Sequence, residues 1–161
     1  MKEVSRALDD EHRATLDLLG RAGQAFARPP RPGSPEATET ARVAASLAQF
    51  IEEHIARHFG FEEQVLFPRL AEAGEGDLAD LLAEEHVTIR AVAAELLPLA
   101  RAAAAGTLDD AGFGALKRGA PELVERLGAH IQKETMSLLP SLDDLLDDDT
   151  DREIAFAYMS G

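Results

Sequence analysis

The sequence predicts an all-α fold, an antiparallel up-down four-helix bundle with a short C-terminal tail. Apolar residues recur with helical spacing over most of the chain, and no stretch alternates as β-strands do. Segments rich in proline and glycine separate four long periodic stretches. At 161 residues the chain has the length of one domain. We therefore expect residues 1–161 to form a single domain, with the bundle at residues 4–142 and an acidic tail at residues 143–161.

The first two helices are expected at about Val4 to Phe26 and about Ala37 to Phe67. Between them lies RPPRPGSP, Arg28 to Pro35, where proline excludes helix and glycine permits a turn. Pro68 is expected near the end of the second helix. The inner stripe of the first helix is Val4, Leu8, His12, Thr15 and Leu19. The inner stripe of the second is Leu47, Ile51, His54, His58, Glu62 and Val65.

The third helix is expected at about Leu78 to Ala105, after a loop at Glu72 to Asp77. Gly106 to Gly114 is expected to be a connection, and the fourth helix begins near Pro121, a favourable first-turn residue. The inner stripe of the third helix is Leu78, Leu82, His86, Ile89, Ala93 and Leu96. That of the fourth is Leu123, Leu127, His130, Glu134 and Leu138, before Pro140. Four such helices form a bundle about 40 Å long, at a rise of about 1.5 Å per residue.

The composition restricts what the protein binds and where it acts. Cysteine is absent, so disulfides, iron–sulfur clusters and thiolate metal sites are excluded, and any metal must bind His, Asp or Glu. The net charge of −14 argues against nucleic acid and anionic membrane surfaces, which repel an acidic protein. The first residues lack the apolar stretch of a signal peptide, and no run has the length of a membrane span. We therefore expect a cytoplasmic protein without a nucleic-acid or membrane partner.

The chain contains an internal repeat. The segment from His58 to Leu70 matches the segment from His130 to Leu142, with His, Glu, Leu, Pro and Leu in the same places and an offset of 72 residues. Upstream, Glu11-His12 matches Glu85-His86 with an offset of 74 residues. Each half is thus a helix with one inward His, followed by a helix with His and Glu one turn apart. This pattern predicts a helical hairpin used twice, with approximate two-fold symmetry.

Six side chains of this repeat are expected to point into the bundle and bind metal. They are His12, His58, Glu62, His86, His130 and Glu134. Residues four apart share a helix face, so a His and a Glu at that spacing can bind one cation or two adjacent ones. Imidazole supplies a neutral nitrogen, and carboxylate supplies charge and can bridge two metals. A single His on such a stripe is more often a core residue, and a buried Glu is costly without a partner. Near both glutamates the inner stripes carry no Lys or Arg except Arg126, so the symmetric set favours a metal site.

These residues resemble the hemerythrin-like, or HHE cation-binding, domain family over about Val4 to Leu142. The resemblance is carried by the segments DEHRATLDLL, HFGFEEQVLFPRL, EEHVTIRAVAAEL and HIQKETMSLLPSL. It implies a non-haem di-iron centre inside a four-helix bundle, with two Fe ions per chain joined by an oxo or hydroxo bridge. It also implies that Glu62 and Glu134 bridge the irons and that the four histidines are terminal ligands.

The chain differs from the oxygen-carrying members of that family. Those have two His one turn apart on the third helix, whereas Arg90 takes the second of these places here, after His86. Thr135 follows Glu134 where a second Glu is expected, a change that we expect to affect only the surroundings of the ligands. The resemblance implies an iron protein that reacts with dioxygen, peroxide or nitric oxide in redox stress or detoxification. The alternative is an oxygen- or iron-sensing or storage protein without turnover, and whether the chain is an enzyme stays open.

Several residues outside the six have open roles. His54 lies one turn before a predicted ligand and is a fifth nitrogen ligand, a proton donor beside the site, or a core residue. Glu11 and Glu85 lie about 100° around the helix from the next His, which favours partners of the ligands over ligands themselves. Tyr158 is expected to pack where the tail folds back. The acidic run at residues 143–151 is expected to be solvated.

Other classes of site fit these residues less well. Ferritin-like carboxylate proteins use Glu-x-x-His, and no Glu lies three residues before any His. A zinc hydrolase fits the ligand types, but two bridging carboxylates among histidines suit iron or manganese better. An interaction module would require six buried polar residues to be accidental. Without metal, we expect Glu62 and Glu134 to repel each other and to have raised pKa values, so that the metal-free fold loses stability as the pH rises.

Overall fold

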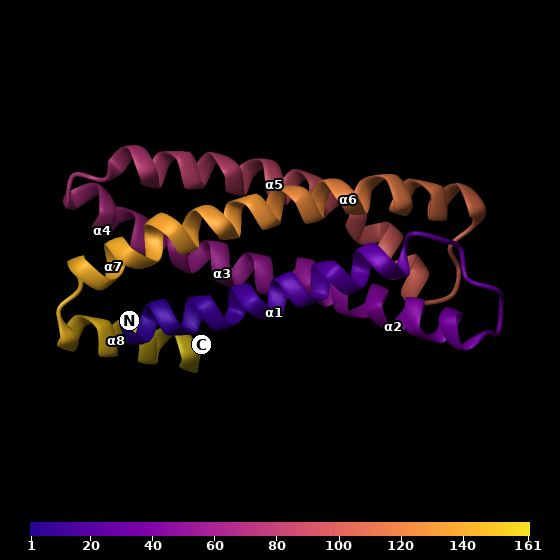
Figure 1. Ribbon diagram of the computed structural model, residues 1–161, viewed down its shortest axis with the longest axis horizontal. Coiled ribbons are helices and arrows are strands. Elements are labelled where there is room, and N and C mark those ends of the chain that lie inside the picture. The colour runs from indigo at the N-terminus through magenta and orange to yellow at the C-terminus, as the bar shows by residue number, and fades with distance from the viewer.

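Four long helical rods run antiparallel in the computed structural model, which describes residues 1–161 and contains no strand (Figure 1). The first rod is α1 (Glu3–Ala25). The second is continuous and comprises α2 (Pro35–Gln49), η1 (Phe50–His54), α3 (Ile55–Phe61), η2 (Glu62–Leu66) and α4 (Phe67–Glu72). The third is α5 (Gly76–Ala104). The fourth comprises α6 (Asp110–Lys133), η3 (Glu134–Leu138) and α7 (Leu139–Leu145). The three η segments are π-helical turns within the rods, and the predicted bundle is confirmed.

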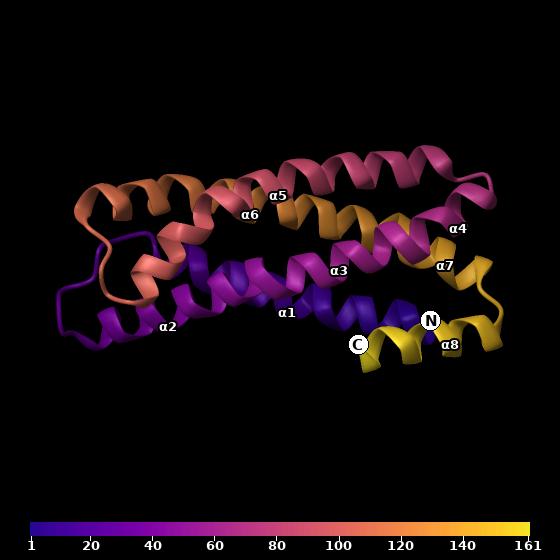
Figure 2. The same ribbon diagram turned by 180° about the vertical axis from the view of Figure 1, so that it is seen from behind.

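A further helix, α8 (Asp148–Ser160), follows the fourth rod and lies beside the N-terminal half of α1 (Figure 2). Asp151 explains this position, because its carboxylate accepts the backbone N–H groups of Glu3 and Val4 at 2.8 and 2.9 Å. These N–H groups belong to the first turn of α1 and have no partner within that helix. The prediction of a solvated acidic run is therefore wrong for Asp151, which is buried, although Asp147 to Asp149 are exposed. No helix of the chain is both long enough and apolar enough to cross a membrane.

The short connections at the ends of α4 and α5 close in the same way. Gly74 and Gly106 have φ angles of 89° and 72°, a left-handed conformation that residues with a Cβ adopt at a cost. In both connections the residue after the glycine donates its N–H to a carbonyl five residues earlier. Glu75 donates to Leu70 at 2.8 Å, and Thr107 donates to Ala102 at 2.9 Å. This glycine-terminated cap turns the chain sharply and places neighbouring rods antiparallel.

Two predicted helix boundaries are wrong. The second rod continues past Pro68 to Glu72. The wide π turn directly before the proline leaves no carbonyl that requires the N–H which proline lacks, so the helix is not interrupted. The fourth rod begins at Asp110 rather than near Pro121. Asp109 caps its first turn by accepting the N–H of Gly112 at 2.7 Å. Pro121 is tolerated in the interior because the carbonyl four residues before it lies on an exposed face, where water can bond it.

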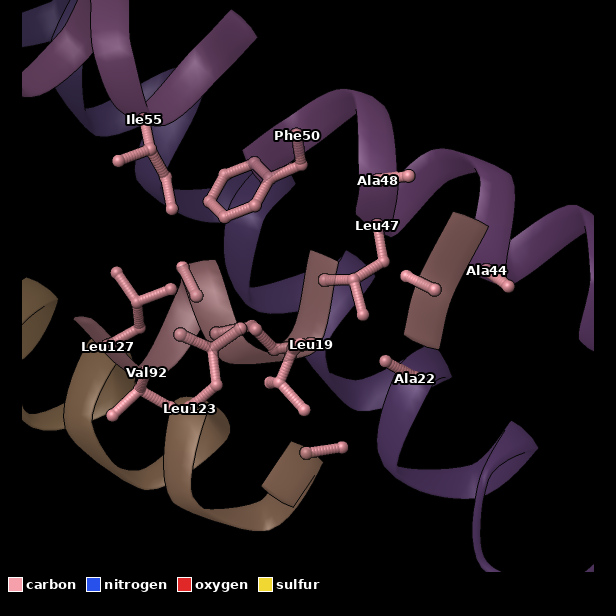
Figure 3. Packing of buried hydrophobic residues seen from close by; sticks show 14 of the residues in the cluster. Leu19, Ala22, Ala44, Leu47, Ala48, Phe50, Ile55, Val92, Leu123 and Leu127 are labelled. Atoms are coloured by element: carbon pink, nitrogen blue, oxygen red, sulfur yellow. The ribbon is translucent and has the colours of Figure 1, made fainter. Parts of the chain in front are cut away.

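Two apolar clusters fill the bundle, one on each side of the predicted site residues. On α1, His12 separates Leu8 in one cluster from Leu19 in the other, and the other three rods repeat this order. Figure 3 shows the larger cluster, whose members include Leu19, Leu47, Phe50, Ile55, Leu123 and Leu127. Burial of each large apolar side chain contributes roughly 1.5–3 kcal/mol. The polar residues are thus held at the centre of the bundle by packed core on both sides.

Candidate metal centre

Glu62 and Glu134 each begin a π turn, at equivalent places in the two halves. In these turns the N–H of Phe67 bonds the carbonyl of Glu62, and the N–H of Leu139 bonds the carbonyl of Glu134, five residues back. The next residue in both halves is a proline, such as Pro68, which has no N–H to donate. The prolines inside α5 and α6 lie in regular helix, so proline alone does not produce the wide turn. Single π turns often occur at functional sites.

Each of these buried carboxylates lies between two imidazoles that come from different halves of the chain. All six residues are 3% exposed or less. The nitrogen–oxygen distances, each from an imidazole Nε2, are 3.0 Å for His58–Glu62, 3.1 Å for His86–Glu62, 2.9 Å for His12–Glu134 and 2.8 Å for His130–Glu134. The structure therefore brings together all six residues that the repeat predicted.

The six donors form two overlapping groups that share the carboxylates. One group contains His12 and His58 with both glutamates, and the other contains His86 and His130 with both glutamates. Within each group the ligand atoms lie within 4.8 Å of one another. We call them the first and second groups, after the half that supplies the histidines. Each group could hold a cation, and Glu62 and Glu134 belong to both groups.

The arrangement fits cations better than hydrogen bonds among the side chains. All four oxygens of Glu62 and Glu134 are buried without an aligned hydrogen-bond partner, and so are both ring nitrogens of His12. The Nε2 atoms of His86 and His130 face each other at 3.1 Å. Buried carboxylates without partners are costly, whereas a cation in each group would satisfy these oxygens and nitrogens together.

Three of the four histidines are held from behind by a carboxylate on a neighbouring helix. The pairs are His58 Nδ1 with Glu11 at 2.7 Å, His86 Nδ1 with Glu63 at 2.8 Å and His130 Nδ1 with Glu85 at 2.8 Å. A carboxylate accepts, so Nδ1 carries the proton and, in the neutral ring, Nε2 presents its lone pair to the site. Such partners fix the orientation of a ligand and raise its basicity.

Each of these outer carboxylates is paired in turn with a cation. Arg57 bonds Glu11, Lys133 bonds Glu85, and Arg90 bonds Glu63 through two nitrogens at 2.6 and 3.2 Å. Sequence reasoning expected Glu11 and Glu85 beside the ligands but missed Glu63 and the roles of the three cations. Glu63 follows a predicted ligand directly, and that doubled glutamate is the signal in the sequence. Arg90 occupies the place of the absent fifth His, and here it holds the partner of His86.

Tyr158 is also part of this outer layer. Its hydroxyl donates to Glu11 at 2.5 Å, its ring stacks on Phe61 at a centroid distance of 4.1 Å, and Arg57 lies over its face. It packs where α8 folds back, as expected, and it also contacts the site through a hydrogen bond that was not predicted. Burial raises the pKa of Glu11, but the hydrogen bonds from His58 and Tyr158 outweigh burial and hold that pKa at about 2.

Without a metal, the site favours protonated histidines. Burial by itself lowers the pKa of His58, but the charge of Glu62 outweighs it and raises the pKa to about 10. The pKa of His86 is raised to about 9, against the effect of burial, by its contacts with both glutamates. Burial raises the pKa of Glu134, but His12 and the other facing histidines hold it well below its ordinary value. The expectation of a raised pKa is therefore wrong for Glu134, because imidazolium rings surround it.

His12 is the one ligand candidate without a partner behind it. Its Nδ1 is buried and unpaired, although the ring is only 3% exposed. The repeat explains the difference, because the residue equivalent to Glu63 is Thr135, which is exposed. The substitution of Thr135 for a second Glu thus affects the surroundings of the ligands, and it leaves the first group less firmly supported than the second.

His54 belongs to neither of the two groups that share the glutamates, but with Glu11 and His58 it forms a third set of potential donors within 4.8 Å of one another. Its ring stacks on Phe50 at a centroid distance of 5.0 Å and lies 5.3 Å from the ring of His58. Its side chain is 27% exposed, and its Nε2 is 3.9 Å from Glu11. This position is that of a neighbour of the ligands at the edge of the site.

Comparison with protein families gives one match of high coverage. The model of the hemerythrin HHE cation-binding domain matches residues 3–142, which include the first three rods, the fourth rod up to Leu142 and every residue of the two groups. A comparison with curated proteins found no match.

Proposed function

The chain belongs to the hemerythrin HHE cation-binding domain family, and on that premise we propose that it holds two iron ions and reacts with dioxygen, peroxide or nitric oxide. The proposed role is protection against redox stress, in the cytoplasm. The proposed ligands are His12 and His58 for one ion, His86 and His130 for the other, with Glu62 and Glu134 shared by both ions.

One observation supports this proposal most strongly. Three histidines have their Nδ1 occupied by a carboxylate, so their Nε2 lone pairs converge, when neutral, on two buried carboxylates whose oxygens have no other partner. A mixed set of imidazole and carboxylate donors suits iron, and the shared carboxylates place the two ions as neighbours. Bound there, a pair of iron ions supplies Lewis acidity and electrons for small oxidants.

The protein's own residues perform three tasks in this proposal. The four histidines and two glutamates hold the ions in the centre of the bundle. The two apolar clusters on either side exclude bulk water from it. Glu11, Glu63 and Glu85 orient the rings and keep the proton on Nδ1. The four histidines supply too few nitrogens to fill two coordination spheres, which leaves positions for an exchangeable ligand.

Metal analysis with spectroscopy tests the proposal. After reconstitution, elemental analysis should find two irons per chain, and the diferrous protein should be oxidised by oxygen within seconds to minutes without a long-lived oxygen adduct. Glu134→Gln should lose bound iron, whereas Glu125→Gln, an exposed change on the same rod, should retain it. Only trace metal in the wild-type protein would refute the proposal.

The same experiment separates turnover from storage or sensing. Repeated consumption of peroxide, well beyond the amount that two irons per chain can reduce once, indicates an oxidoreductase. A single stoichiometric reaction favours the alternative of a sensing or storage protein. A stable, reversible oxygen adduct would contradict the proposed reactivity.

A further inference from the structure

Two surface grooves of the bundle occupy equivalent places in the repeat. The first groove, about 470 Å³, lies between α1 and the second rod, and the second groove, about 350 Å³, lies between α5 and α6. Residues that line the first groove include Glu11, Ala14, Phe50, Glu53, His54 and Arg57. Their equivalents line the second groove and are Glu85, Thr88, Glu122, Glu125, Arg126 and Ala129. The chain therefore contains two candidate entrances to one buried centre.

A small inner cavity lies against the first group of donors. Its volume is about 10 Å³, which is close to the space that one water molecule needs. It is lined by His12, His58, His130 and Glu134 from the site. A molecule in this cavity is in contact with four of the six donors, so the cavity is where a small exchangeable ligand fits.

The two grooves differ in how they meet this cavity. Thr15, Phe50 and His54 line both the first groove and the cavity, and so form the wall between them. The second groove shares only His130 with the cavity. In the second groove the equivalents of Phe50 and His54 are Glu122 and Arg126, which form an exposed ion pair at 3.0 Å. These two residues line the groove but not the cavity.

His54 is the part of this wall that can move most easily. Its ring makes no hydrogen bond; it stacks on Phe50, and its Nε2 lies 3.9 Å from a Glu11 oxygen. Its side chain is partly exposed, and rotamer changes of exposed side chains are fast. By contrast, Thr15 is 5% exposed and Phe50 is 8% exposed, and the Phe50 ring projects from η1 into the packed interior (Figure 3).

We propose that molecules of two or three heavy atoms reach the centre through the first groove, past a movable His54 ring, and that the second groove is not an entrance. This inference rests on the proposed function, because it assumes an ion pair with an exchangeable position at the inner cavity. His54 is then a gating residue that sets the rate and the size limit of entry.

Azide binding to the ferric protein, followed by absorption after rapid mixing, tests the inference without relying on turnover. His54→Trp fills the wall, and Arg126→Trp makes the same change at the equivalent place in the second groove. We expect His54→Trp to slow association and dissociation of azide by about tenfold or more, while the equilibrium constant stays within about twofold, as a gate requires. Arg126→Trp should leave both rates near those of the wild type.

His54→Ala keeps the test decisive if the tryptophan variant does not fold. It should accelerate azide entry and exit, again with little change in affinity, and iron content should stay at the wild-type value. Unchanged rates in both His54 variants, or equal slowing by Arg126→Trp, would overturn the gate while leaving the proposed function intact. A wild-type protein that binds no iron pair or no azide would overturn the proposed function, and the gate with it.

Discussion

His12 and His86 occupy equivalent places in the two halves but are held in different ways. His86 has its Nδ1 against Glu63, and its ring stacks on Phe59 at 3.7 Å with the planes 3° apart. His12 has neither support, since Thr135 takes the place of the carboxylate. The repeat thus places the ligands of both halves at the same helical spacing, whereas the groups behind the ligands differ between the halves. We infer that the two metal positions differ in affinity although their donors are of the same types.

The largest effect is expected from removing the metal. In the iron-free protein the raised pKa values of His58 and His86, about 10 and about 9, stabilise the fold fully below about pH 6.5, and this contribution is lost as the pH rises through those values. The lowered pKa of Glu134 stabilises the fold at pH values above the ordinary pKa of a glutamate. This contribution is lost as the pH falls into the acid range. The proposed iron ions would replace the protons on the histidines, so they should stabilise the fold most at high pH.

Removing iron should therefore lower the Tm near pH 9 by roughly 8–16 °C for each ion lost, if each binds with a Kd about a thousandfold below the free iron concentration, and by less near pH 6. Differential scanning calorimetry of iron-loaded and chelated protein at both pH values measures this. The stability of the iron-free protein thus falls as the pH rises, which is the direction expected from repulsion between the carboxylates. The cause, however, is the loss of protons from the histidines. A difference in Tm that shrinks as the pH rises would contradict this explanation.

The next effect compares the supports of the two inward histidines. Glu63→Ala leaves His86 without its partner and should weaken iron binding by about 10–100-fold, which is typical for loss of such a residue. Thr135→Ala, at the equivalent place behind His12, should change affinity little, because Thr135 is exposed and His12 Nδ1 is already unpaired. Competition with a chelator of known affinity measures both. Equal losses in the two variants would show that the halves are supported alike.

The smallest effect concerns α8, whose Asp151 accepts two N–H groups from the first turn of α1. Asp151→Ala removes the acceptor for the N–H groups of Glu3 and Val4 and should lower the free energy of unfolding by about 1–2 kcal/mol, as loss of a helix cap does. Asp144→Ala, an exposed change in the same acidic run, should stay within about 0.5 kcal/mol. Urea denaturation of both variants gives these values, and equal values would mean that Asp151 does not cap α1.

The sequence was sufficient to predict the rods and the inward face of each, since helical period and the repeat place the six donors on apolar stripes. It was not sufficient to pair Glu63 with His86, because that pairing depends on the register between two different helices. The early start of the fourth rod was missed because three glycines disfavour helix there. One of them, Gly119, has a packing reason, since a Cβ at this position would lie 2.7 Å from Leu96. The capping of α1 by Asp151 was missed because it joins residues 147 apart, Asp151 and Val4.

The hydrogen bond from Tyr158 to Glu11 gives the last helix a consequence for evolution. α8 lies beyond the region that the family model matches, and it touches the support of only one ligand, His58. A mutation in α8 can therefore alter the surroundings of one half of the centre while the ligands of both halves stay in place. Because Ile154, Ala155 and Tyr158 also pack in the smaller apolar cluster, a change in α8 acts on the core and on one half of the centre together.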